Sequence, residues 1–159
     1  MDKIFSRRQI GLLLAGGLGA ASAHAQAEAR KSGAIHQEVD FKVAPERIYK
    51  VLLDAKEFSA FTQNKAEIQA QPGGTFKLFN GQIEGRNVEL IPNRRIVQAW
   101  RPASWPAGEY SIVRFEFLPR GAETHLVFDH AGFSEDRLEH LKEGWRNHYW
   151  EPLHKYLKA

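Results

Sequence analysis

Hydrophobic and polar residues alternate from Ile35 to Lys42, and this pattern predicts a β-strand with one buried face. A helix is expected directly afterwards, because Ala44-Pro45-Glu46 supplies a proline for the first helical turn and an acidic side chain beside it. Asp54 and Glu57 have the spacing of an N-terminal capping pair, which predicts a second short helix. The domain is therefore expected to begin with one strand and two short helices.

Strand-like segments separated by turn residues continue as far as residue 130. Asn80-Gly81 is the strongest turn signal, because this dipeptide favours a two-residue hairpin. Glu84 and Glu89 lie on one strand at odd spacing, so they are expected on opposite faces of the sheet. About seven strands are expected in all, and those after the first cover residues 66–71, 75–79, 82–91, 95–101, 109–118 and 123–130.

The last part of the chain has the periodicity of one long helix. Ser134 is placed to cap it, and Pro152 is expected to kink it because proline has no N–H to donate. The apolar residues recur at intervals of three or four: Leu138, Leu141, Trp145, Tyr149, Leu153 and Tyr156. A largely antiparallel sheet and a single helix long enough to cover it predict an α+β domain whose sheet wraps around the C-terminal helix.

The N-terminal residues have the organisation of an export signal. A charged start leads into an uncharged run from 10 to 23, and alanines at alternating positions follow, as at a signal-peptidase site. Ser6, Arg7 and Arg8 precede this run and are typical of a twin-arginine signal. Sec export is the alternative, because Ile10 stands where the twin-arginine motif prefers phenylalanine. The protein is therefore expected to be exported to the periplasm.

Removal of the signal changes the charge of the protein. The formal charge is +3, from 22 Lys and Arg against 19 Asp and Glu, and loss of residues 1–25 reduces it to +1. So small a charge does not favour nucleic acid as a partner. The apolar run is shorter than the ~20 residues of a bilayer span, so no stable membrane insertion is expected after cleavage. The expected division is a cleavable signal at 1–27, a linker at 28–33 and one domain at 34–159.

Composition narrows the chemistry that the domain can perform. The chain has no cysteine, which excludes disulfides, thiolate metal sites and thiol nucleophiles. His148, Glu151 and His154 recur at helical spacing, but they spread over about 120° of the helix surface, so no metal is expected. Motifs of phosphate-binding loops, zinc proteases and serine hydrolases are absent, and no catalytic residue or cofactor is predicted.

Aromatic residues of the concave sheet face and of the helix form the candidate ligand site. Gln98 and His130 continue the apolar phase of their strands and are the polar candidates, with His130 able to orient a ligand or act as a general base. The same composition is typical of an ordinary core, which is the alternative interpretation. The candidate cavity residues are Phe76, Leu78, Gln98, Trp100, Phe115, Phe117, Phe128, His130, Trp145 and Tyr149.

The second half of the chain carries motifs that resemble a known family. They are Gly81-Gln82-Ile83-x-Gly85-x-Asn87-Val88-Glu89-Leu90-Ile91-Pro92, Arg95-Ile96-Val97-Gln98-x-Trp100-Arg101, Trp105-Pro106-x-Gly108, Gly121-x-x-Thr124-x-Leu126 and Gly144-Trp145-x-x-x-Tyr149-Trp150-x-Pro152-Leu153. Together they resemble the C-terminal domain of the activator of the 90-kilodalton heat-shock chaperone ATPase. That family belongs to the SRPBCC or START-like superfamily, so the resemblance implies a helix-grip fold.

Three functions follow from these observations as expectations. The first is an exported START-like domain that binds a small, mainly apolar ligand between sheet and helix without catalysis. The second, implied by the resemblance, is a co-chaperone-like module with a solvent-facing patch around Trp105 as its anchor. The third is an enzyme, since relatives in the superfamily include cyclases and hydrolases.

Overall fold

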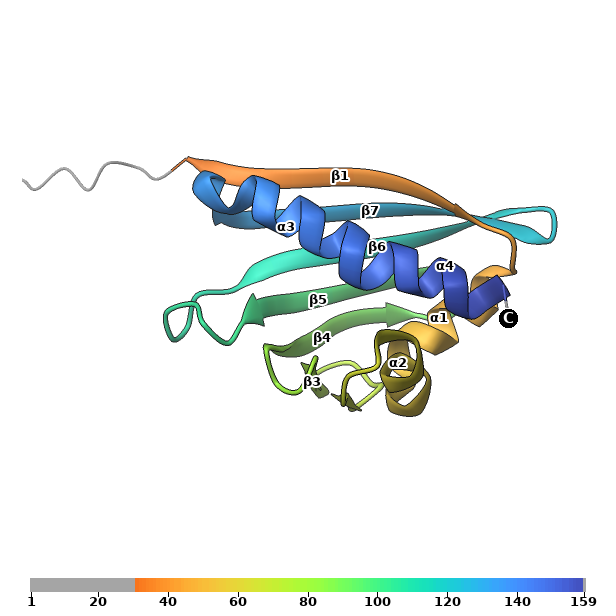
Figure 1. The fold of residues 1–159 in the computed structure, drawn as a ribbon, viewed down its shortest axis with the longest axis horizontal. Coiled ribbons are helices and arrows are strands. Elements are labelled where there is room, and N and C mark those ends of the chain that lie inside the picture. Colours follow the sequence, from red (N-terminus) through yellow and green to blue (C-terminus); the bar gives the residue numbers. More distant parts are fainter. Residues whose placement is uncertain (1–30, 159) are drawn as a thin grey trace, which may run out of the picture.

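Seven antiparallel strands form one sheet, and a long helical segment lies across it in the computed structural model, which describes residues 31–158 (Figure 1). The strand order is β1-β7-β6-β5-β4-β3-β2. The strands are β1 (Ser32–Phe41), β2 (Glu67–Ile68), β3 (Thr75–Leu78), β4 (Ile83–Ile91), β5 (Arg95–Pro102), β6 (Ser111–Arg120) and β7 (Glu123–Ser134). The expected α+β helix-grip fold is confirmed.

The first and last strands pair along their whole length. The pairing begins at Ser32, opposite Ser134, so β1 includes the last residues of the segment expected as a linker. Lys31 extends the contact, because its carbonyl accepts a hydrogen bond from the backbone N–H of Glu135 at 2.9 Å. This backbone bond serves the start of the helical segment, where the expected side-chain cap from Ser134 is not formed.

Two short helices connect β1 to the rest of the sheet. Helix α1 (Pro45–Leu53) begins at the expected proline, and α2 (Ala55–Thr62) begins at Asp54. The Asp54 carboxylate accepts hydrogen bonds from the backbone N–H groups of Lys56 and Glu57, at 2.9 and 3.0 Å, which confirms the predicted cap. Both helices bury their apolar sides against the core.

The β3–β4 connection is longer than the predicted two-residue hairpin. Leu78 pairs with Ile83, which leaves four residues in the turn. Three of them, Phe79, Asn80 and Gly81, have positive φ angles of 52°, 58° and 85°. The Phe79 ring nevertheless packs against the core aromatics, and the turn therefore presents an apolar side chain inward.

Glu84 and Glu89 differ from the expectation, since both lie on the outer face of the sheet. A β-bulge shifts the β4–β5 register between Asn87 and Glu89, so the alternation of faces changes phase within β4. Glu84 forms an ion pair with Arg101 and Glu89 with Arg95, and these arginines share one face of β5. The two glutamates thus pair with two different arginines.

The C-terminal helical segment is interrupted just before Pro152. It consists of a 3₁₀ turn (Glu135–Arg137), α3 (Leu138–Trp145), a π-turn (Arg146–Trp150) and α4 (Glu151–Lys158). In the π-turn the Glu151 N–H donates to the Arg146 carbonyl, five residues back. This spacing stacks Trp150 on Trp145, with ring centroids 5.8 Å apart, and buries Trp150, which the helical periodicity did not include.

The helical segment covers the inner face of the sheet with large aromatic side chains. Trp145 is 2% exposed and its ring centroid lies 4.3 Å from that of Phe128 on β7. Leu153 and Leu141 are buried further along the same segment. None of the helices within residues 31–158 combines the length and hydrophobicity that crossing a bilayer requires.

Trp145→Ala is expected to lower the free energy of unfolding by about 3–5 kcal/mol, because a fully buried indole leaves a cavity that the surroundings fill only in part. Urea denaturation measures the change. Lys155→Ala, at an exposed position of α4, is the control and should stay within about 0.5 kcal/mol of the wild type. Equal stability of the two variants would show that the helical segment is not docked through Trp145.

Candidate functional site

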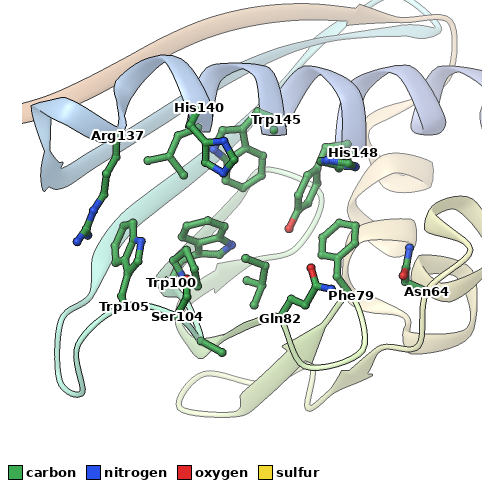
Figure 2. Close-up of a pocket in the computed structure, with 16 residues that line it drawn as sticks. Asn64, Phe79, Gln82, Trp100, Ser104, Trp105, Arg137, His140, Trp145 and His148 are labelled. Atoms are coloured by element: carbon green, nitrogen blue, oxygen red, sulfur yellow. The ribbon is translucent and has the colours of Figure 1, made fainter.

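A cavity of about 640 Å³ opens between the helical segment and the loops at one end of the sheet. Figure 2 shows His140, Trp145 and His148 projecting from the helix, with Trp100 and Trp105 on the opposite side. The lining residues are Asn64, Phe79, Gln82, Ile83, Trp100, Pro102, Ala103, Ser104, Trp105, Arg137, His140, Leu141, Gly144, Trp145, His148 and Tyr149. Its volume lies within the range of about 300–1,000 Å³ that is typical of small-molecule sites.

Aromatic rings make up the inner wall of this cavity. Trp145 lies between Trp100 and Tyr149, with ring-centroid distances of 5.5 and 4.2 Å. Phe79 meets Tyr149 edge-on at 5.4 Å, and Trp105 meets Trp100 edge-on at 6.1 Å. These tilted and edge-to-face contacts are favourable for aromatic pairs, so the wall is a packed structure rather than a set of independent side chains.

Trp100 presents an unpaired hydrogen-bond donor in this wall. Its side chain is 4% exposed, and its indole N–H has no acceptor within hydrogen-bonding geometry. The Tyr149 hydroxyl lies beside it, and burial raises the pKa of this phenol well above its usual range, so the phenol stays protonated. The indole nitrogen has less than 1 Å² of accessible surface, so it is enclosed beside the Tyr149 hydroxyl and is not open to the cavity.

His130 connects two of the tryptophans without reaching the cavity. Trp145 Nε1–H donates to His130 Nδ1 at 3.0 Å, which leaves the ring proton on Nε2 to donate to Ser111 Oγ at 2.8 Å. The Ser111 hydroxyl in turn donates to the Trp100 carbonyl at 2.9 Å. Because every group in this chain is satisfied, His130 fixes the positions of Trp100 and Trp145.

Arginines hold the loop between β5 and β6 against the rest of the domain. Arg101 is buried and donates to Glu84 and to the backbone carbonyls of Trp105 and Pro106. Arg137, from the start of the helical segment, lies 4.3 Å over the Trp105 ring and pairs with Glu109. Trp105 is consequently only 9% exposed, and the predicted solvent-facing patch around it is wrong.

The predicted cavity residues fall into three groups. Trp100, Trp145 and Tyr149 line the 640 Å³ cavity. A second space of about 10 Å³, no larger than a single water requires, is lined by Phe76, Leu78, Gln98, Phe115 and again Tyr149. The third group, Phe117, Phe128 and His130, lines neither space and is fully buried. Phe128 and His130 contact Trp145 of the helical segment, whereas Phe117 packs against Tyr49 of α1.

Gln98 differs from the expectation of a free polar group. Its amide donates to Asn87 Oδ1 at 2.9 Å, and Asn87 donates to the Gln69 carbonyl at 2.9 Å. These bonds satisfy the buried backbone and side chains around the β4 bulge. Gln98 therefore stabilises the sheet at this irregularity instead of offering a contact to a ligand.

The cavity residues that the sequence analysis did not predict come mainly from loops and from a second side of the C-terminal helical segment. Phe79 and Trp105 lie on turns, where no periodicity assigns a direction to a side chain. Arg137, Gly144 and His148 recur along the helix on the side next to the apolar stripe. That spacing is the one signal that could have identified this edge of the helix.

His148 and His154, whose helical spacing was considered for a metal site, each contact a different aromatic ring. The His154 ring stacks on Phe41 at 4.4 Å, and the His148 ring meets Phe79 edge-on at 6.1 Å. Within residues 31–158 no group of three or more His, Cys, Asp or Glu side chains could hold a metal ion. The predicted export signal, with Ser6, Arg7 and Arg8, lies outside the described residues.

The burial of His130 predicts a pH dependence of stability. Burial lowers the pKa of His130 to about 3, whereas its unfolded value is near 6.5. The neutral His130 therefore makes its full contribution to the free energy of unfolding above pH 6.5. That contribution is lost as the pH falls from 6.5 toward 3, by up to about 1.4 kcal/mol per pH unit. His130→Gln can make similar hydrogen bonds without titrating, so its stability should fall less steeply in urea denaturation between pH 7 and 4. Parallel slopes would contradict a buried neutral histidine.

Comparison with known proteins agrees with the fold. Residues 42–158 match the family described as "Activator of Hsp90 ATPase homolog 1-like protein". The human activator of 90 kDa heat shock protein ATPase homolog 1 is 31% identical over 113 residues, which are 71% of this chain and 33% of the human protein. The matched part of the chain thus spans about a third of the length of that relative.

Solved structures show the same architecture. An HSP90 activator from Plasmodium falciparum has a TM-score of 0.73 and 25% identity, covering 79% of this chain and 96% of that one. CalU16 from Micromonospora echinospora shares the fold with a TM-score of 0.68 at 21% identity, covering 79% and 76% of the two chains. With its SRPBCC or START-like helix-grip fold and its match over residues 42–158, the chain belongs to the activator of Hsp90 ATPase homolog 1-like family.

Proposed function

We propose that this domain binds a small, mainly apolar ligand in the cavity between the helical segment and the loops of the sheet. The observation that carries the proposal is the 640 Å³ cavity itself, whose inner wall consists of packed aromatic rings, among them Trp100, Trp145 and Tyr149. A mainly apolar ligand would displace water from this wall, and the burial of apolar surface on both sides favours binding.

The proposed role is binding without turnover. The cavity lining contains two histidines, His140 and His148, but no Asp or Glu side chain that could orient either of them as the base of a catalytic pair. Ser111 and His130 are neighbours, but the serine donates its proton to a backbone carbonyl and the histidine donates to the serine, which is the reverse of nucleophile activation. Neither residue lines the cavity.

The location proposed for this function is outside the cytoplasm. The arginine pair Arg7-Arg8, the uncharged run behind it and the alternating alanines support export by the twin-arginine route. That route carries folded proteins, so the domain would arrive with its cavity already formed. The periplasm would then supply the ligand.

Chaperone binding is the second candidate function, favoured by family membership. The relatives are named as activators of the 90 kDa heat shock protein ATPase. If this domain shares that role, it should stimulate the ATPase of a purified 90 kDa heat-shock protein, and filling the cavity should not change the stimulation. An unchanged ATPase rate at saturating domain concentrations would contradict the second candidate.

Gly144 provides the test of ligand binding. It lies on α3 in the cavity lining, and a Cβ at this position would meet nothing within 4 Å. Gly144→Phe should therefore place a ring in the cavity and weaken binding of the neutral probe N-phenyl-1-naphthylamine at least tenfold. Fluorescence titration of the wild type should show saturable binding. The fold should not be weakened, because glycine is less favourable in a helix than phenylalanine.

Glu143→Phe is the matched control for this substitution. Glu143 precedes Gly144 on the same helix, is exposed and does not line the cavity. The control adds the same ring to the surface, so its probe affinity should equal that of the wild type. Non-saturable binding to the wild type, or equal loss in both variants, would refute a ligand site in this cavity.

Export predicts a mature N-terminus after Ala25 or Ala27, which N-terminal sequencing of the extracytoplasmic fraction measures. Arg7→Lys combined with Arg8→Lys should abolish export by the twin-arginine route, because that route requires the arginine pair. Sec export should tolerate the same change, since lysine keeps the positive charge of the signal. Soluble cytosolic protein that retains Met1 would contradict export by either route.

A further inference from the structure

We propose that the open edge of β1 pairs with the same edge of a second copy of this chain, in antiparallel orientation, so that two seven-stranded sheets become one continuous sheet. β1 forms the border of the sheet in Figure 1, and among residues 31–158 only β7 pairs with it. No residue of β1 lines the 640 Å³ cavity. The interface therefore does not depend on the proposed ligand function and goes beyond it.

Every second residue of β1 directs its backbone groups away from β7. The Lys31 carbonyl accepts from the Glu135 N–H, so residue 31 faces β7, and the direction of the backbone groups alternates along an antiparallel strand. The bulge in this pairing adds Gly132 to β7 and leaves the alternation along β1 unbroken. The residues whose N–H and C=O groups point to the open side are Ser32, Ala34, His36, Glu38 and Asp40.

The two edges of the sheet differ in their protection against such pairing. β2, at the other edge, has only two residues. Long edge strands of soluble proteins are usually protected by lysine, proline or a charge that points inward. β1 spans ten residues without lysine or proline. Its inward side chains are uncharged, namely Ile35, Gln37, Val39 and Phe41. β1 therefore has the properties of a strand that can accept a partner.

Charge selects one register for a two-fold pairing. Hydrogen-bonded pairs can form only between residues that direct their backbone groups outward, and the two such registers that overlap almost all of β1 centre on His36 and on Gln37. The first places His36 opposite itself, and like charges directly opposite each other are destabilising. The second places His36 opposite Glu38 of the second copy, on both sides of the two-fold axis. We therefore assign the register centred on Gln37.

The side chains at the open edge suit this register. His36 Nδ1 donates to Asp129 Oδ1 at 2.7 Å, and this bond, together with the contact to Glu38, raises the pKa of the imidazole and favours its cationic form. His36 and Glu38 are 60% and 57% exposed, so both are accessible to a second copy. On the inward face the same register places Ile35 opposite Val39 of the second copy, which adds apolar contact.

Glu38→Lys tests the interface through its charges. Light scattering after size-exclusion chromatography at pH 6 should give the wild type twice the mass of one chain. Glu38→Lys should raise the Kd of the dimer at least about tenfold, because two attractive cross-strand pairs become repulsive. Glu143→Lys makes the same charge change at an exposed position of α3 and should leave the Kd unchanged.

A single introduced thiol tests the register, because the chain has no cysteine. Gln37 would face itself in a non-hydrogen-bonded pair, with Cα atoms about 4.5 Å apart, which a disulfide can bridge. Gln37→Cys should therefore form a covalent dimer under mild oxidation, as measured on a non-reducing gel. Val39→Cys is the control on the same face of β1. The two copies of residue 39 would be four positions apart along the strand, about 13 Å, and should not be linked.

Each possible result decides the proposal. A wild type that is monomeric at every concentration overturns it and leaves the edge to an extended segment of another protein. A dimer that Glu38→Lys leaves intact shows that β1 is not the interface, and a disulfide through residue 39 but not residue 37 refutes the assigned register. Gln37→Cys loses the hydrogen bond from Trp150. If that variant does not fold, the comparison of Glu38→Lys with Glu143→Lys decides.

Discussion

The hydrogen bond from the Trp145 indole to His130 is the contact on which both the core and the cavity depend. It joins the helical segment to β7 at a position without access to water, and Ser111 extends it to the backbone of Trp100. A neutral imidazole suits this place because it has one donor and one acceptor on opposite sides of the ring. Burial keeps it neutral by lowering its pKa. Trp100 and Trp145, which both line the cavity, are consequently held in position by a residue that does not line it.

The fold was predictable from periodicity, while the cavity was not. Alternation on β5, β6 and β7 identified the inner face, and the stripe through Leu141, Trp145 and Leu153 identified the covering helix, because both patterns follow directly from burial. The cavity is formed by side chains whose direction depends on local irregularities. Phe79 points inward from a turn of positive φ angles, and Trp105 is held by distant arginines. No pattern in a single sequence encodes such contacts.

Irregular elements also explain the other differences between sequence and structure. The bulge in β4 placed Glu89 on the face where alternation excluded it, and Gln98 and Asn87 satisfy the polar groups that the bulge leaves inside. The π-turn before Pro152 changed the helical spacing and turned Trp150 into the core. In both cases one additional residue alters the phase of a regular pattern. Bulges and π-turns often mark functional positions, and here the π-turn carries two residues of the cavity lining, His148 and Tyr149.

The pairing of β1 with β7 determines when the domain can fold. These strands come from opposite ends of the domain, and the Trp150–Gln37 hydrogen bond closes a separation of 113 residues. Contacts of such long range cost loop entropy before they contribute stability, so topologies of this kind fold slowly. The inner face of the sheet also stays uncovered until the helical segment, which follows all seven strands in the chain, has emerged. A nascent chain therefore exposes the aromatic residues of the sheet, such as Trp100 and Phe128, until the helical segment brings Trp145 and Tyr149 against them and completes the cavity.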